Sequence, residues 1–191
     1  MLKLHDYVLS AECYTVRLML ALLELPHERI AVDAYPGGAD CPVLIDGDDV
    51  HRDPGLILTF LARANGPQWL PTDSAQEVAG WLAFTATRLA SLAEARRVAI
   101  MGLEGDLDAL NAKGREALRL LEDVLTERGL AGRDWLVGTS PTIADIAVFP
   151  HVMLSHDSGI GHEDYPAINL WQRRVRRLPR FVGMPGIPDY F

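Results

Sequence analysis

An almost unbroken apolar segment near the start of the chain constrains the fold most. Residues 13–25, with the sequence CYTVRLMLALLEL, are long enough for a buried helix, and Pro26 stops the run. Short strand candidates stand on both sides of it, at residues 2–7 and 27–32. A strand, a helix and a strand within about 30 residues predict a βαβ unit. The chain therefore begins as an α/β fold.

A hairpin is predicted after a broken loop. Residues 33–41 hold Pro-Gly-Gly and are too short and too interrupted for a packed helix, so we expect a loop there. Strand candidates at residues 42–45 and 49–51 flank Asp46-Gly47, which favours a tight turn because glycine adopts positive φ at little cost. The two strands are expected to pair antiparallel.

The rest of the chain has a helical pattern. A helix is predicted over residues 55–64, with Asp53 as its N-cap and Pro54 at the first helical position, where a missing N–H costs nothing. The linker NGPQWLP follows at residues 65–71. Beyond it, helices are predicted at residues 74 to about 101, 107–128, 143 to about 154, and 168–177. We expect an α/β domain at residues 1–65 and an all-helical domain at residues 74–191.

Composition restricts the class of partner. The 191 residues are 49% hydrophobic and carry a formal charge of −8, which argues against general binding to nucleic acid or to an anionic membrane. Five arginines crowd one late helix but lie on more than one of its faces, as a solvated surface would: Arg173, Arg174, Arg176, Arg177 and Arg180. No basic leader precedes an apolar run, so a cytoplasmic protein is expected. The histidines have no zinc-like spacing, and no metal is assigned.

Short motifs add a family resemblance. They are LSAECY at residues 9–14 followed by VRL, CPVL at 41–44, RD at 52–53 before IL, WLVG at 135–138, TIADIA at 142–147 and FVGMPGI at 181–187. In this order they resemble the cytosolic glutathione S-transferase superfamily, closest to bacterial members with a serine motif. The resemblance covers essentially the whole chain. It implies a thioredoxin-like N-terminal domain and an α-helical C-terminal domain.

The resemblance places Ser10 at the thiol-activating position. A hydroxyl before a helix can donate to a bound thiolate, and the exposed N–H groups and helix dipole favour the same negative charge. That would lower the thiol pKa of bound glutathione. The other interpretation is a plain N-cap serine.

Two cysteines lie near this position. Ser10 and Cys13 are spaced like a Cys-x-x-Cys motif whose first cysteine is replaced, so Cys13 is expected to be a buried packing residue. Cys41 is either a thiol exposed to substrate or a small buried filler. The resemblance implies that Pro42 is cis and that the backbone of Cys41 holds the cysteinyl part of glutathione. An ordinary strand-start proline is the alternative.

The resemblance also predicts a degenerate glutathione site. Asp53 matches the family's acidic residue for the γ-glutamyl end, but Pro54 replaces the usual serine and supplies neither hydroxyl nor N–H. Up to two hydrogen bonds to a charged group are lost, each worth about 1.5–3 kcal/mol. The loop at residues 33–41 replaces the helix that normally serves the glycyl end. Glutathione binding is therefore expected to be weakened.

Other motifs divide between structure and substrate. Thr142-x-x-Asp145 is predicted to be a structural capping box. The helix that lines the acceptor pocket in relatives carries five candidates here: Trp81, Phe84, Arg88, Arg96 and Arg97. Its arginines either meet an anionic substrate or form salt bridges at the surface.

Three functions remain open from the sequence. The first is a glutathione S-transferase-like enzyme that activates glutathione for attack on a small electrophile. The second is a thiol-dependent enzyme recruited to a specialised pathway, for sulfur insertion, ether cleavage or isomerisation. The third is a non-catalytic binding or scaffold protein that kept the fold. The resemblance implies a homodimer through the third helix of the fold and the first helix of the C-terminal domain.

Overall fold

A computed structural model describes residues 1–32 and 41–184. The chain begins with β1 (Leu2–Asp6), α1 (Ala11–Leu22) and β2 (His27–Ala31). Strands β1 and β2 pair in parallel. The predicted βαβ unit is confirmed. The predicted loop at residues 33–40, and the loss of a helix there, lie outside the described residues.

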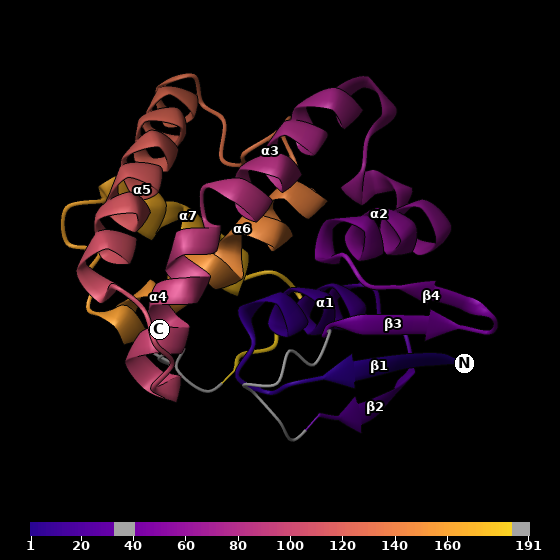
Figure 1. Ribbon diagram of the computed structural model, residues 1–191. Coiled ribbons are helices and arrows are strands. Elements are labelled where there is room, and N and C mark those ends of the chain that lie inside the picture. The colour runs from indigo at the N-terminus through magenta and orange to yellow at the C-terminus, as the bar shows by residue number, and fades with distance from the viewer. Residues whose placement is uncertain (33–40, 185–191) are drawn as a thin grey trace.

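The hairpin completes a four-stranded mixed sheet. Strands β3 (Val43–Asp46) and β4 (Asp49–His51) pair antiparallel, as predicted, around Gly47 at φ 61°. The strand order is β2-β1-β3-β4. The sheet lies at one end of the molecule, and α1 packs against helix α6 (Ile143–Met153) of the C-terminal part (Figure 1).

Helix α2 (Pro54–Asn65) begins as the sequence predicts. The Asp53 carboxylate accepts a hydrogen bond from the N–H of Leu56 at 2.8 Å, and Pro54 occupies the first turn. The following helices are α3 (Ala75–Thr87), α4 (Ala90–Met101), α5 (Leu107–Leu130), α6 (Ile143–Met153) and α7 (Pro166–Arg176). Short 3-10 turns join them: η1 (Pro67–Trp69), η2 (Thr72–Ser74) and η3 (Leu154–Ser158). The division into domains at residues 65–74 stays a prediction.

The prediction of one helix from residue 74 to about 101 is wrong. The chain breaks at Arg88 and Leu89, where both N–H groups bond the carbonyl of Phe84. Leu89 turns inward and is fully buried. The break lets α3 pack on α6 while α4 packs on α5 and η3. Local sequence carries no glycine or proline at this point, and the break coincides with the burial of Leu89.

Helix α6 is the centre of the C-terminal core, and every one of its residues is buried. The predicted capping box is confirmed at its start, where Asp145 accepts the N–H of Thr142 at 2.9 Å. Asp145 also accepts the N–H of Leu136 and the indole N–H of Trp171, at 3.0 and 2.8 Å. The carboxylate thus joins three segments as well as capping one helix.

Candidate functional site

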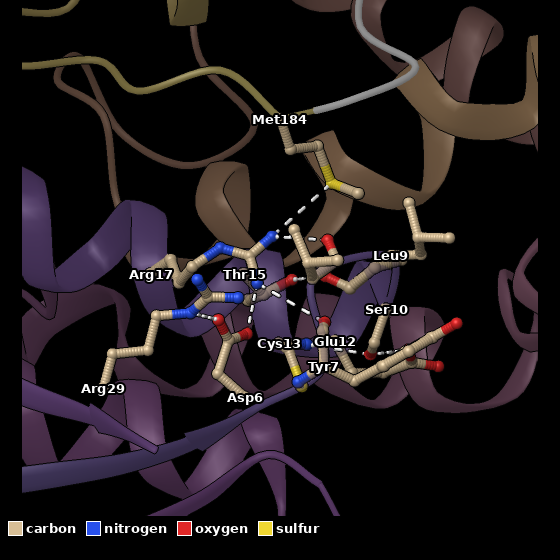
Figure 2. Close-up of polar contacts among 12 residues, drawn as sticks. Asp6, Tyr7, Leu9, Ser10, Glu12, Cys13, Thr15, Arg17, Arg29 and Met184 are labelled. Carbon is tan, nitrogen blue, oxygen red and sulfur yellow. Dashed lines mark hydrogen bonds and ion pairs between the residues drawn. The ribbon is translucent and has the colours of Figure 1, made fainter. Parts of the chain in front are cut away.

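The loop before α1 is held by an ion-pair network. Asp6, at the end of β1, is fully buried and pairs with Arg17 of α1 and Arg29 of β2. Arg17 also donates to the carbonyls of Tyr7 and Val8, at 3.4 and 3.0 Å. Figure 2 shows Arg17 between Asp6 and the loop carbonyls. A buried carboxylate is stable only when paired, so this network fixes the loop that leads into α1.

A second arginine holds the same loop from the C-terminal part. Arg96 of α4 is buried, pairs with Asp157 at 2.7 Å and donates to the carbonyl of Leu9. Arg96 was expected among the pocket residues. The structure instead places it in the wall of the small hollow that Ser10 also lines, where it holds the carbonyl of Leu9.

Ser10 is the N-cap of α1, as the plain N-cap interpretation of the sequence predicted. Its Oγ accepts the N–H of Cys13 at 3.1 Å and donates to a carboxylate oxygen of Glu12 at 2.8 Å (Figure 2). The hydroxyl proton therefore points to Glu12. A bound thiolate would have to compete with this carboxylate for the proton. The thiol-activating role of Ser10 stays a prediction.

Glu12 belongs to a polar cluster that the sequence did not suggest. Its other carboxylate oxygen pairs with Arg97 of α4 at 2.9 Å, and His151 of α6 lies nearby. Burial opposes ionisation of Glu12, but the charges of His151 and Arg97 and the Ser10 hydroxyl outweigh it, so its pKa lies below the ordinary value. The spacing of these residues in the sequence does not indicate the cluster, because three separate helices, α1, α4 and α6, supply them.

His151 is buried without a hydrogen-bond partner on Nδ1. Burial lowers the pKa of His151, with the charge of Glu12 acting against this and that of Arg97 adding to it. Arg97 is a permanent cation, and its ion pair with Glu12 favours the ionised carboxylate. An unpaired polar nitrogen in a buried position favours a ligand group beside it.

A cavity of about 380 Å³ lies beside this cluster. Its walls come from α1, the start of α2, α3, α4 and α6, and they are mostly small or apolar. Glu12, Arg97 and His151 form part of its polar surface, and Asp53 and Pro54 line it as well. The volume falls in the range of small-molecule sites, which is about 300–1,000 Å³.

Ser10 does not line this cavity. It lines a separate hollow of about 10 Å³, and the Glu12–Arg97 pair borders both spaces. The ion pair therefore stands between the serine and the cavity. Side-chain movement of Glu12 or Arg97 would join them.

The five pocket candidates of the sequence are dispersed. Only Arg97 among them lines the 380 Å³ cavity. Trp81 and Phe84 pack on each other edge to face, with ring centroids 5.3 Å apart, against the core. Arg88 lines a different hollow, between α3 and α5. The break in the helix at residues 88–89 accounts for part of this difference, because the two halves face different neighbours.

The Cys41–Pro42 bond is cis, as the resemblance implied. Cys41 is half-buried, between the two predicted alternatives, and Cys13 is fully buried as predicted. The two thiols lie close enough that each shifts the pKa of the other. Their proximity could not be predicted from the sequence, because 28 positions separate them and only the fold brings them together.

Among the described residues, no group of three His, Cys, Asp or Glu side chains is placed to hold a metal ion. Within residues 1–32 and 41–184, no helix combines the length and apolar character needed to cross a membrane.

The comparisons with known proteins decide the family. A family model for the C-terminal domain of glutathione S-transferases matches residues 103–174. The structure of a glutathione S-transferase from Pseudomonas fluorescens is 30% identical, with a TM-score of 0.84 over 96% of this chain and 98% of that one. The chain belongs to the glutathione S-transferase superfamily.

Other solved transferases agree with this fold. A glutathione S-transferase from Xanthobacter autotrophicus is 25% identical, with a TM-score of 0.84 over 97% of this chain and 98% of that one. A glutathione transferase homologue from Lodderomyces elongisporus, with two glutathione molecules per subunit, is 18% identical, with a TM-score of 0.81 over 94% of each chain. The latter supports the fold alone. Comparison with curated protein sequences finds no match. The superfamily's two-part fold is thus the fold of this chain.

Proposed function

We propose that this superfamily member is a glutathione-dependent transferase that adds the thiol of glutathione to a small electrophile. The observation that carries the proposal is Ser10, a buried hydroxyl at the N-cap of α1. The N–H groups and dipole of the helix end favour a thiolate beside that hydroxyl. The thiolate is the attacking species, so stabilising it raises the rate at neutral pH.

Glutathione would lie along the start of β3 and the start of α2. The backbone of Cys41 would pair with its cysteinyl part, and Asp53 would meet its γ-glutamyl amine. Pro54 offers no hydroxyl or N–H to the γ-glutamyl carboxylate, so affinity is expected to fall by about two decades relative to a site with both bonds. The Asp53 carboxylate already caps α2, which leaves one of its oxygens for a ligand.

The electrophile would occupy the 380 Å³ cavity. Its apolar walls suit a compact apolar body, and His151 offers Nδ1 to one polar substituent. The Glu12–Arg97 pair would have to open for the thiolate at Ser10 to reach it. This predicts an apolar electrophile with a single hydrogen-bonding group.

The decisive test combines binding with turnover. Glutathione at about 100 times its Kd should raise the free energy of unfolding by about 2.7 kcal/mol. Conjugation to chlorodinitrobenzene should fall at least about tenfold in Ser10→Ala, while the exposed control Ser140→Ala keeps the wild-type rate. Equal rates in wild type and Ser10→Ala would remove the catalytic assignment.

A non-catalytic binding protein is the second candidate. This alternative is favoured because the Ser10 hydroxyl already donates its hydrogen bond to Glu12. On this alternative, glutathione stabilises the protein against unfolding but no conjugation is measured with any electrophile. A recruited thiol-dependent enzyme would instead turn over only a particular electrophile from a panel.

A homodimer is proposed through α2 and α3. Only Val78 of α3 is buried, although the helix is mainly apolar, and Leu56 of α2 is 65% exposed. Apolar faces of this kind are typical of subunit interfaces. Light scattering should give twice the chain mass at micromolar concentration, and a monomer would contradict the proposal. A cytoplasmic location is also proposed, which two free cysteines fit.

A further inference from the structure

The two cysteines of the chain meet beside the N-terminus of α1. Strand pairing places His5 opposite Val43, and the same register extended by two residues places Tyr7 opposite Cys41. The N–H of Tyr7 donates to the Sγ of Cys13 at 3.4 Å. One backbone position therefore adjoins both cysteines, and their thiols lie close enough that each shifts the pKa of the other.

The two thiols are unequal. Cys13 is fully buried and Cys41 is half-exposed. The hydrogen bond to Cys41, together with burial, raises the pKa of Cys13. The same hydrogen bond lowers the pKa of Cys41 and outweighs its burial. Cys41 is thus the more accessible and the more acidic of the two thiols, and Cys13 lies buried behind it.

We propose that Cys41 and Cys13 form a dithiol site that exchanges with low-molecular-weight disulfides. The Cys41 thiolate attacks one sulfur of the disulfide, a bond forms between Cys41 and that sulfur, and the other half leaves as a thiolate. Cys13 then loses its proton and attacks the Cys41 sulfur, which expels the second half. The protein is oxidised by two electrons, and the small disulfide is reduced to two thiols.

A low-molecular-weight thiol closes the cycle. Two equivalents reduce the Cys13–Cys41 disulfide and leave as their own disulfide, so no other reductant is needed. Serine at position 10 removes the nucleophile from the usual Cys-x-x-Cys place, and Cys41 supplies it from the neighbouring strand. This activity is independent of the transferase proposal, because it uses the protein's own sulfurs and no electrophile.

The experiment follows the mass of the intact full-length protein after incubation with glutathione disulfide. Wild type should lose two hydrogens and gain no glutathione. Cys13→Ser should instead hold one glutathione on Cys41, because nothing expels it. Cys41→Ser should remain unmodified, because the remaining thiol is buried and protonated. Since these are the only two cysteines in the chain, each product has one assignment.

A measurement on the wild-type protein tests the proposal even if the cysteine variants fail to fold. Brief alkylation with iodoacetamide and peptide mapping should show Cys41 modified at least about tenfold faster than Cys13. Prior oxidation with glutathione disulfide should block both sites until a thiol is added. A stable glutathione adduct on wild type, a disulfide between two chains, or faster alkylation of Cys13 would each overturn the proposal.

Discussion

Replacing Glu12 by glutamine should lower the pKa of glutathione bound beside Ser10. The Ser10 hydroxyl donates to an ionised carboxylate at 2.8 Å. A hydrogen bond to a charged group is worth about 1.5–3 kcal/mol and one to a neutral group about 0.5–1.5 kcal/mol. Releasing the Ser10 hydroxyl from glutamine should therefore cost about 1–1.5 kcal/mol less than releasing it from the Glu12 carboxylate. Removing a negative charge next to the thiolate acts in the same direction. The expected change is about one pKa unit.

The assay is the pH dependence of kcat/KM for conjugation to chlorodinitrobenzene. The acid limb, which reports ionisation of the thiol, should move down by about one pH unit in Glu12→Gln. The exposed Glu127→Gln serves as the matched control and should leave the limb in place. In a Ser10→Ala background, the part of the shift that passes through the hydroxyl should disappear. An acid limb that stays, or moves upward, would refute the reasoning.

Three further predictions concern stability. Burial, with a contribution from a neighbouring histidine, lowers the pKa of His162 from 6.5 to about 4. On acidification, the free energy of unfolding measured by urea titration should therefore fall less in His162→Gln than in wild type. Asp6→Ala leaves Arg17, which is only 15% exposed, without its buried partner and should cost about 3–5 kcal/mol in chemical unfolding. Gly114→Ala places a methyl group 2.4 Å from the Leu92 side chain and should lower the free energy of unfolding by about 1–3 kcal/mol.

Each stability prediction has a control and a contrary result. Folded His162 binds fewer protons than the unfolded chain between these pKa values, so its contribution of about 3 kcal/mol is present above pH 6.5 and lost as pH falls to about 4. Parallel acid slopes in wild type and variant would contradict this. Glu28→Ala, which breaks a half-exposed pair, should cost at most about 1 kcal/mol. Gly129→Ala meets no atom within 4 Å and should be neutral or stabilising, so equal losses at both glycines would contradict the packing argument.

Local sequence determined the elements of this protein where short-range chemistry is strong. The apolar run after residue 12, the Asp-Gly turn, the Asp53 cap and the Thr142–Asp145 capping box each act within a few residues. Such signals need no distant partner, so the elements that they begin or join could be predicted. The family resemblance added the cis bond before Pro42.

Tertiary structure alone decided the break at Leu89 and the composition of the site. Leu89 is buried at the break in the continuous helical pattern. Arg96 and Arg97, which are consecutive in α4, contact different neighbours. Glu12 meets Arg97 and His151 because α1, α4 and α6 converge, and no spacing within one helix encodes that meeting. Sequence identified which residues can carry charge, a hydroxyl or a thiol. Which of them share a proton depends on distances that only the packing of helices and strands sets.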